Sequence, residues 1–300
     1  MKSEPKKIGG GILKKSLTGE LLAEFIGTLI LIFIGAGCVA GLVLTGATYS
    51  QWEISVIWGL GVTMAIYITG AVSGTHINPA VTIALMIFRD FPRKKVLPYI
   101  ASQVAGAFTG AALVYTMYRG AFMEFEQQTG MVRGSMESLQ TAGIFSTYPQ
   151  SYIGNIQALF IEIVITAFLL MVIFAVTDER NVNAPKGKYA PFAGLLIGLT
   201  IAIIGSSFGA LTGFAMNPAR DFGPKLFTAV AGWGAAGIPG PNNYFWVPIV
   251  GPIIGGICGA FIYDFAIRKN IAGEVSVAQK EVQEPALKEE DVRRLLKEEN

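Results

Sequence analysis

Two copies of the tripeptide Asn-Pro-Ala are the segments with the clearest potential for chemistry. They are Asn78, Pro79 and Ala80, and Asn217, Pro218 and Ala219. Asparagine commonly caps the N-terminus of a helix, and proline fits the first helical position because its missing N–H would lack a partner there. Each copy opens an apolar stretch, 78–88 and 217–227. Such a stretch would reach only about 16 Å as a helix, half of a bilayer core, so the motifs predict half-length helices.

Chemistry follows if the two helix N-termini face each other. Their dipoles then disfavour cations and protons at that point, and the amides of Asn78 and Asn217 can donate hydrogen bonds to a passing hydroxyl or water. The glycine-containing segments before them, 74–77 and 213–216, should not be helical. Irregular backbone at membrane depth persists only where it is buried or lines a polar cavity, so its carbonyls are expected to act as acceptors. These expected acceptors are the carbonyls of Gly74, Thr75, His76, Ile77, Phe214, Ala215 and Met216.

An internal repeat supplies the elements that would position the motifs. The stretches GAVSGTHINPA (70–80) and GALTGFAMNPA (209–219) share six of eleven residues at an offset of 139. Glu24 and Glu162 follow at an offset of 138, each inside the first apolar segment of its half. Each half contains three spans, and an odd number makes the second half enter from the opposite face. The repeats are therefore predicted to be inverted, with both motifs near the membrane midplane.

The composition is that of a membrane protein. Hydrophobic residues make up 52% of the 300 residues and charged residues 15%, against about 25% charged in ordinary soluble domains. The 36 glycines fit closely packed membrane helices. We predict an all-α membrane protein with six transmembrane helices and two re-entrant half-helices, because a span needs roughly 20 apolar residues. The six predicted spans are 18–44, 54–73, 96–118, 155–177, 189–208 and 244–268.

Lysine and arginine residues between the spans predict the orientation. Fourteen lie in the N-terminal segment and after spans two, four and six, whereas only Arg119 and Arg133 lie in the loop 119–154. Cytoplasmic loops carry the excess of such residues, so both termini are predicted to be cytoplasmic. The expected organisation is a cytoplasmic segment 1–17, a membrane domain 18–268 and a charged cytoplasmic tail 269–300. The inverted halves would cover about 18–118 and 155–268.

Several classes of function find no support in the sequence. The basic residues form short clusters between apolar runs, which gives no basis for nucleic-acid binding. Cys38 and Cys258 lie inside apolar segments, so neither a disulfide framework nor a metal site is expected. There is no nucleophile–base set and no phosphate-binding glycine-rich loop, and one histidine, His76, leaves little for acid–base catalysis. We expect neither enzyme activity nor a cofactor.

These motifs resemble those of the aquaporin superfamily, also called the major intrinsic proteins, and most of all its aquaglyceroporin branch. The resemblance covers about residues 18–268. It implies one pore per chain, a homotetramer in the inner membrane of a bacterium, and passive diffusion of glycerol, related small neutral polyols and some water, with ions and protons excluded. The matching stretches are QWEISVIWGLGV, SGTHINPAVTIAL, SQVAGAF, VRGS, FSTYP and LTGFAMNPARDFGPK.

The resemblance also implies a narrow filter formed by Trp52, Gly205, Phe214 and Arg220. Arginine offers rigid paired donors that suit two adjacent hydroxyls, and its charge repels cations. Trp52 and Phe214 would give an apolar corner for the carbons of a polyol. Gly205 would leave width where water-selective relatives carry histidine. For Trp52 the alternative is an anchor at the membrane interface, because it lies near the end of a predicted span.

Four more residues are expected to support the pore. Glu24 and Glu162 would accept hydrogen bonds from the re-entrant loops, and Asp221 and Lys225, four residues apart on a helix, would form a salt bridge. A proton relay through the glutamates and a pH gate through the ring of His76 are the alternatives. A water-selective channel is the alternative function within the family, and a coupled transporter or a membrane enzyme are the alternatives outside it.

Overall fold

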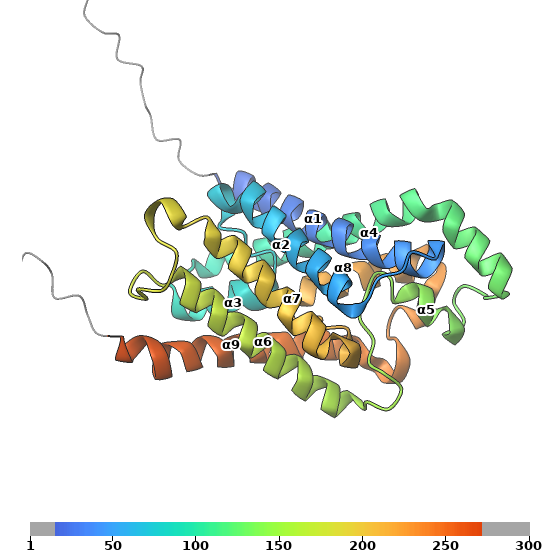
Figure 1. Cartoon of the computed structure of the whole chain (residues 1–300). Helices are drawn as coiled ribbons and strands as arrows, with labels where there is room; N and C mark the ends of the chain where they lie inside the picture. Colours follow the sequence, from blue (N-terminus) through green and yellow to red (C-terminus); the bar gives the residue numbers. More distant parts are fainter. Residues whose placement is uncertain (1–15, 272–300) are drawn as a thin grey trace, which may run out of the picture.

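The computed structural model describes residues 16–271, which fold into a bundle of helices (Figure 1). Six helical segments in this part of the chain are long and apolar enough to cross a membrane, which confirms the predicted number of spans. No strand forms within residues 16–271. The segments are α1 (Leu17–Thr45), α2 (Gln51–Ser73), α4 (Arg93–Thr129), α6 (Asn155–Thr177), α7 (Phe192–Thr212) and Pro241–Asn270, which is built around α9 (Val247–Ile262).

Two short helices begin at the Asn-Pro-Ala motifs, α3 (Pro79–Phe88) and α8 (Pro218–Thr228). The side-chain oxygen of Asn78 accepts a hydrogen bond from the N–H of Ala80 at 2.8 Å, and that of Asn217 from the N–H of Ala219 at 3.0 Å. Each asparagine thus caps its helix, and proline occupies the first helical position in both. The two predicted half-helices are confirmed.

The ends of two spans differ from the prediction. Helix α4 continues to Thr129 instead of ending near 118. Its last turns contain Glu and Gln, which form helices readily in water, and Phe122 is fully buried there. The helix stops at Gly130, whose φ of 68° is the left-handed C-terminal cap that glycine provides. In the last span, the α-helix covers only Val247–Ile262, and 3₁₀ and π turns extend it at both ends. Apolar composition therefore located these spans but not their ends.

Glycines at helix crossings let the backbones of each half approach closely. A Cβ on Gly106 of α4 would lie 2.2 Å from the carbonyl oxygen of Phe25 in α1. A Cβ on Gly255 of α9 would lie 2.3 Å from the carbonyl oxygen of Ile163 in α6. Any side chain at these positions would force the helices apart. The α1–α4 crossing and the α6–α9 crossing thus use a glycine in the same way, one in each half of the repeat.

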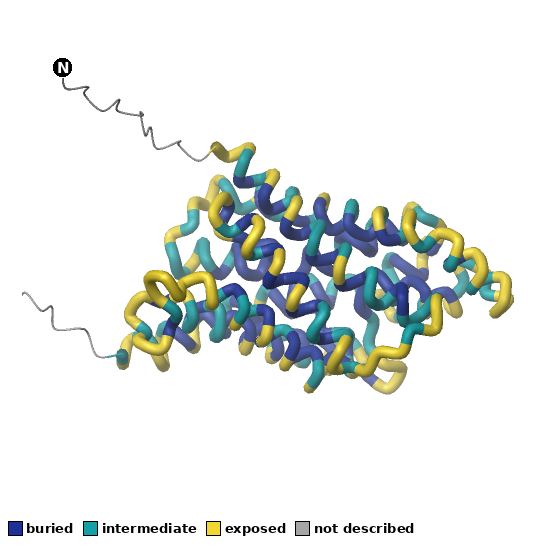
Figure 2. The backbone as a smooth tube through the Cα atoms, turned by 45° about the horizontal axis from the view of Figure 1, so that its top comes forward, coloured by how far each residue is buried: buried dark blue, intermediate teal, exposed yellow. Residues whose placement is uncertain are grey.

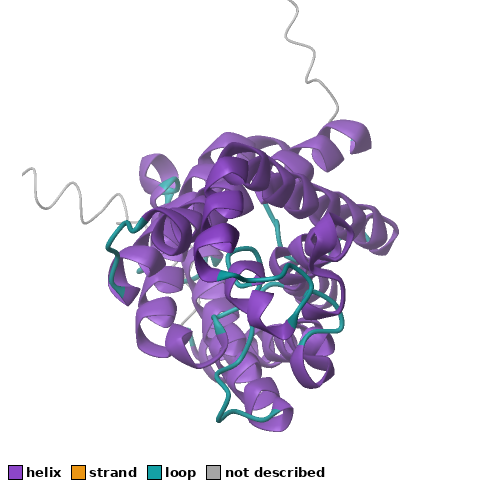
Figure 3. Cartoon of the chain, turned by 90° about the vertical axis from the view of Figure 1, so that its right-hand side faces the viewer, coloured by secondary structure: helices purple, strands orange, loops and turns teal. Residues whose placement is uncertain are grey.

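The bundle surrounds irregular segments at its centre. Buried backbone runs along its middle, and exposed residues gather at the two ends and on the outer surface (Figure 2). In the end-on view, loop segments cross the middle of the outline formed by the helices (Figure 3), and the loop residues 75–78 and 214–217 are buried. The start of α1 and the end of the last span lie at the same end of the bundle (Figure 1). The predicted segment 1–17 and tail 269–300 lie almost wholly outside the described residues, and the cytoplasmic orientation stays a prediction.

Candidate functional site

A cavity of about 680 Å³ lies along the bundle, between the two halves of the repeat. Two kinds of surface line it. The polar groups are the backbone and side chains of the motif segments and the guanidinium of α8; the residues concerned are Gly74, Thr75, His76, Ile77, Asn78, Phe214, Ala215, Met216, Asn217 and Arg220. The apolar surface comes from the spans and includes Leu31, Trp58, Val62, Ile66, Leu85, Leu169, Ile197 and Ile201. Such a cavity suits a solute that has both hydroxyls and a hydrocarbon backbone.

The two asparagines join the halves of the repeat where the half-helices meet. The Nδ2 of Asn78 donates to the carbonyl of Met216 at 2.9 Å, and the Nδ2 of Asn217 donates to the carbonyl of Ile77 at 2.8 Å. A side-chain amide carries two N–H donors. These contacts use one donor of each amide, and both asparagines line the cavity. The second N–H of each amide can therefore donate to a solute.

The loops before the motifs have the same strained backbone in both halves. Thr75 and Ile77 have φ values of 50° and 42°, and their counterparts Phe214 and Met216 have values of 41° and 51°. Left-handed φ at residues other than glycine costs on the order of 1–3 kcal/mol each and persists only where the surroundings impose it. The surroundings that do so here are two buried carboxylates.

Glu24 and Glu162 each hold one loop from behind. Glu24 accepts hydrogen bonds from the N–H groups of His76 at 2.9 Å and Ile77 at 2.7 Å. Glu162 accepts them from the N–H groups of Ala215 at 3.0 Å and Met216 at 2.9 Å. Both carboxylates are fully buried and neither lines the cavity. The geometry gives them a structural task and places no proton relay along the cavity.

The same hydrogen bonds decide where the carbonyls point. In a planar trans peptide the C=O is opposite to the N–H of the next residue. The N–H groups of His76 and Ile77 face Glu24, so the carbonyls of Thr75 and His76 face away from it. The carbonyls of Phe214 and Ala215 face away from Glu162 in the same way. Of the expected acceptors, the carbonyls of Ile77 and Met216 already receive an N–H from the opposite asparagine.

Arg220 and two aromatic rings meet at one end of the cavity. The Arg220 side chain is buried, and its Nη1 donates to the carbonyl of Phe145 at 3.0 Å. Its guanidinium carbon lies 3.9 Å from the centre of the Trp58 ring. The rings of Trp58 and Phe214 meet edge to face, with their centres 6.4 Å apart. A fixed positive charge and two apolar faces therefore lie together in the lining, at the place where the sequence predicts the constriction.

The expectation that Trp52 belongs to this constriction is wrong. Trp52 lies in the first turn of α2, is 54% exposed and does not line the cavity. Trp58 lies six residues later, which is about 9 Å deeper and on another face of the helix. Gly35 of α1 leaves space for the Trp58 ring, because a Cβ at Gly35 would lie 2.3 Å from that ring. The position of Trp52 fits the alternative of an interface anchor.

Gly205 contributes through Phe214 instead of through the cavity wall. It does not line the cavity, and its carbonyl accepts a hydrogen bond from Nε2 of Gln51 at 2.9 Å. A Cβ on Gly205 would lie 2.7 Å from Oγ of Ser55 and 2.9 Å from Cε2 of Phe214. The absence of a side chain at Gly205 is what lets the Phe214 ring take its place beside Trp58.

Asp221 and Lys225 form a fully buried ion pair behind the constriction. The carboxylate of Asp221 also accepts from the N–H and the hydroxyl of Thr147, both at 2.7 Å. Lys225 donates to the carbonyl of Thr147 at 3.0 Å. A buried pair of this kind is tolerated when further hydrogen bonds satisfy both charges. The Asp221–Lys225 pair fixes Thr147, which is two residues from the Phe145 carbonyl that Arg220 contacts. Neither Asp221 nor Lys225 lines the cavity.

His76 lines the cavity but its ring is held in the protein. Nδ1 lies 3.2 Å from Oγ1 of Thr82, and the ring packs against Phe91 and Tyr99 with centres 4.6 Å and 5.0 Å away. The ring is thus held by two aromatic neighbours that also contact each other, with centres 4.9 Å apart. A carbonyl contribution of His76 agrees with this arrangement, and its role stays a prediction.

At the far end of the cavity, Asp178 anchors the connection between α6 and α7. Its carboxylate accepts from the N–H of Arg180 at 3.0 Å, the hydroxyl of Tyr263 at 3.1 Å and Nε of Arg268 at 3.0 Å. Burial alone raises the pKa of this carboxyl, but these hydrogen bonds and the charge of Arg268 outweigh it, so the pKa lies below its ordinary value. Thr177, beside Asp178, and Ala190 line the cavity at this end.

Sequence comparisons give consistent relatives. The profile of the family described as "Major intrinsic protein" matches residues 12–263. The glycerol uptake facilitator protein of Escherichia coli strain K12 is 56% identical over 266 residues, covering 88% of this chain and 93% of that protein. The propanediol uptake facilitator of Salmonella typhimurium strain LT2 is 54% identical over 261 residues, covering 86% and 97%.

A solved structure has the same fold. The aquaglyceroporin from Plasmodium falciparum superposes with a TM-score of 0.75 at 32% sequence identity, covering 85% of this chain and 99% of that one. The match thus extends over most of this chain and almost all of that one.

Proposed function

Because the chain belongs to the major intrinsic protein family, we propose that it is a passive membrane channel for glycerol and related small neutral polyols. We further propose that it has some water permeability and excludes ions and protons. The observation that carries the proposal is the constriction of Arg220, Trp58 and Phe214 on a cavity with one polar and one apolar surface. The names of the E. coli and Salmonella relatives support a small polyol as the solute.

The lining accounts for passage of a polyol in single file. At the constriction, two adjacent hydroxyls can accept from the guanidinium of Arg220, while the carbons lie against Trp58 and Phe214. Farther in, hydroxyls can donate to the loop carbonyls of both halves. They can accept from the free amide N–H groups of Asn78 and Asn217 at the centre. The hydrogen bonds that the polyol loses on leaving water are thus replaced one after another along the cavity. No conformational cycle of the protein is required.

Exclusion of ions follows from the same parts. Arg220 is the only lysine, arginine, aspartate or glutamate among the described residues that line the cavity, so its charge is not neutralised within the lining. The N-termini of α3 and α8 add positive potential at the centre. A cation would therefore have to pass close to the positive charge of Arg220 after losing water, and that charge repels it. A coupled transporter would need an ion site, and the lining contains no carboxylate that could provide one.

The cellular setting is proposed from the spans, the charge asymmetry and the relatives. The six apolar spans and the bacterial relatives support an integral membrane protein of a bacterium. Inner-membrane location, cytoplasmic termini, a channel domain 18–268 and a homotetramer are proposals that rest on the charge asymmetry, the repeat and the family. Exposed apolar side chains on the spans, such as Ile68 and Phe160, suit contact with lipid or a neighbouring subunit.

Stopped-flow light scattering on proteoliposomes tests the proposed function. A glycerol gradient should cause reswelling much faster than in empty liposomes, without any ion or proton gradient. A sucrose gradient reports water exit separately. Fast water exit without added glycerol permeability would assign the protein to water-selective channels, and uptake that depends on an imposed gradient would indicate coupling.

The two tryptophans of α2 should behave differently. Trp58→Ala removes an apolar face of the constriction and the ring beside Arg220, so the ratio of glycerol to ribitol permeability should fall roughly fivefold to tenfold, the scale of about 1–1.4 kcal/mol. Trp52→Ala should leave this ratio unchanged, because Trp52 is exposed at the start of the helix. Both variants are compared by stopped flow. A larger effect at Trp52 than at Trp58 would refute the assignment.

Gly205→His should reduce glycerol flux more than water flux. A Cβ at this position already lies within 2.9 Å of Phe214, so the imidazole must displace that ring into the constriction. Water needs less width than a three-carbon polyol, and we expect the ratio of glycerol to water permeability to fall about tenfold. Gly37→Ala is a matched control, because no atom lies within 4 Å of a Cβ there. Equal loss of both fluxes would contradict the width argument.

A further inference from the structure

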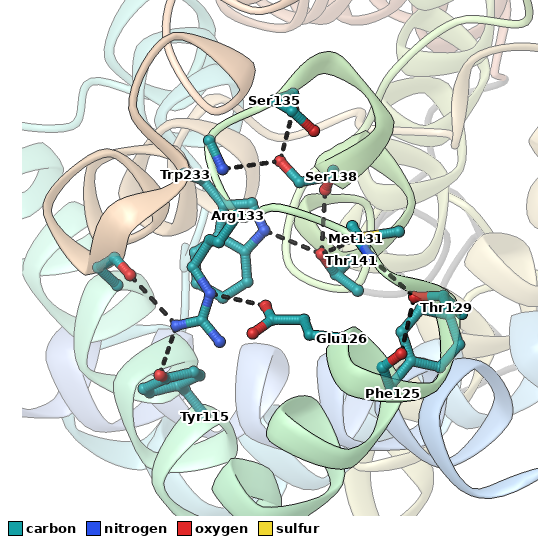
Figure 4. A network of polar contacts seen from close by, with 12 residues as sticks. Tyr115, Phe125, Glu126, Thr129, Met131, Arg133, Ser135, Ser138, Thr141 and Trp233 are labelled. Carbon is teal, nitrogen blue, oxygen red and sulfur yellow. Dashed lines mark hydrogen bonds and ion pairs between the residues drawn. The ribbon is translucent and has the colours of Figure 1, made fainter.

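Arg133 lies in the connection after α4, outside the cavity, yet several groups hold its guanidinium (Figure 4). Nε donates to the carboxylate of Glu126 at 2.7 Å, and Nη1 donates to the hydroxyl of Tyr115 at 2.6 Å. A longer contact of 3.4 Å joins Nη1 to the carbonyl of Ala231. These partners come from α4 and from the π turn that follows α8. Arg133 therefore links α4 and its own connection to the π turn, where Ala231 lies 98 residues later in the chain.

The guanidinium also covers the ring of Trp233. Its central carbon lies 4.4 Å from the ring centre, a geometry in which a cation is attracted to the aromatic face. The indole N–H of Trp233 donates to Oγ1 of Thr141 at 2.9 Å. Trp233 is fully buried. Its face contacts Arg133 and its polar edge contacts Thr141, and Figure 4 shows the ring between these two residues.

Trp233 in turn packs against Phe145, which carries the carbonyl that Arg220 contacts. The ring centres of Trp233 and Phe145 are 5.8 Å apart, in an edge-to-face arrangement. Phe122 stacks on Phe145 at 5.7 Å and also meets Trp233 at 5.6 Å, so the three rings contact one another. Phe145 is fully buried and its backbone carbonyl accepts from Nη1 of Arg220 at 3.0 Å. Contacts thus run without a gap from Arg133 to the constriction.

We propose that Arg133 is a positioning residue for the filter. By fixing Trp233 it fixes the ring of Phe145, and with it the carbonyl that orients the guanidinium of Arg220. This inference rests on the proposed function for its choice of solutes. Asp221 and Lys225 hold Thr147, and the Arg133 cluster (Tyr115, Glu126, Arg133 and Trp233) holds Phe145, so the segment that faces Arg220 is fixed at both ends.

The test compares solute ratios in proteoliposomes, because a ratio does not depend on how many channels are correctly folded. Arg133→Gln removes the charge and the cation–π contact. Tyr115→Phe removes only the oxygen that accepts from Arg133 and keeps the packed ring. Glu124→Gln is the matched control, since Glu124 is exposed on the same helix and bonds only to Gln128 in the described contacts. Glycerol, ribitol, water and proton fluxes are measured for each.

Arg133→Gln should lower the glycerol-to-ribitol ratio roughly fivefold and raise proton flux relative to water flux, because a loosened Arg220 no longer presents fixed donors. Tyr115→Phe should change both ratios in the same direction by a smaller factor, and Glu124→Gln should match the unmodified protein. Lower flux at unchanged ratios in both variants would overturn the inference and leave Arg133 a purely structural residue. If Arg133→Gln does not fold, Tyr115→Phe decides alone.

The two proposals fail separately. If the unmodified protein does not carry glycerol, the proposed function is wrong. The ratio of proton to water flux then still reports on Arg220 and decides the positioning role.

Discussion

Arg220→Ala is expected to raise proton and sodium permeability about a hundredfold while water still passes. Arg220 is the one permanently charged side chain in the described lining, and a cation at the constriction must pass close to it. At an effective dielectric constant of about 20, a monovalent cation about 5 Å from the guanidinium is repelled by about 3 kcal/mol, which is worth about a hundredfold in permeability. Proton flux is measured with a pH-sensitive dye inside the liposomes.

Arg220→Lys separates the charge from the geometry. Lysine keeps the positive charge, so most of the cation exclusion should persist. It has no rigid fork of donors, so it cannot contact the Phe145 carbonyl and two hydroxyls of a solute in the same way. The glycerol-to-ribitol ratio should therefore fall in both variants, whereas proton leak should rise mainly in the alanine variant. An alanine variant with unchanged leak and selectivity would remove Arg220 from its proposed role.

Local motifs allowed the parts of this protein that depend on nearby residues to be predicted. Asn78 and Asn217 cap helices through bonds to residues two and three positions later, so their effect is visible in the sequence. The repeat and an odd number of spans per half predict inversion without any coordinates. The pairing of Glu24 and Glu162 with the two loops follows from that symmetry once a buried carboxylate needs donors.

The composition of the constriction depends on contacts that have no local pattern. Trp52 and Trp58 lie on the same helix, and the packing of α2 against its neighbours decides which one faces the cavity. Their spacing of six residues puts them on different faces, and the second is deeper, where an interface anchor does not belong. That depth was a usable signal. The contact of Gly205 with Phe214 depends on how the loop folds back on the end of α7, and the contact of the Phe145 carbonyl with Arg220 joins residues 75 positions apart, so neither could be predicted.

Span ends were difficult for a different reason. The apolar part of α4 ends near the predicted residue, but helix formation does not need an apolar environment. Good helix formers in 119–129 continue the helix outside the bilayer, and Phe122 buries its ring against Trp233 and Phe145 there. This extension carries Glu126 to Arg133. The residues that were missed are therefore the ones that link the extension to the filter.

Glu162→Ala is expected to have the largest effect on the fold of the pore. The substitution leaves the N–H groups of Ala215 and Met216 and the hydroxyl of Thr212 without their acceptor in a buried place. Hydrogen bonds to a charged group contribute about 1.5–3 kcal/mol each, so the loss should be about 4 kcal/mol or more in the free energy of unfolding. The midpoint temperature of thermal unfolding, measured on the purified protein in detergent, should be clearly lower for Glu162→Ala than for Glu124→Ala, a surface control.

Function should be lost beyond the loss of stability. Phe214 and Met216 keep left-handed φ values only while Glu162 holds the intervening N–H groups, so without it the loop relaxes. The carbonyls of Phe214 and Ala215 then turn from the cavity, and glycerol flux per folded channel should fall at least about tenfold, the equivalent of about 1.4 kcal/mol. Glu162→Gln keeps one acceptor oxygen, so its glycerol flux should lie between that of Glu162→Ala and that of the unmodified protein. A glutamine variant with normal glycerol flux and reduced proton flux would instead make Glu162 part of a proton path. Glutamine still accepts hydrogen bonds from the loop, but it cannot take up and release a proton.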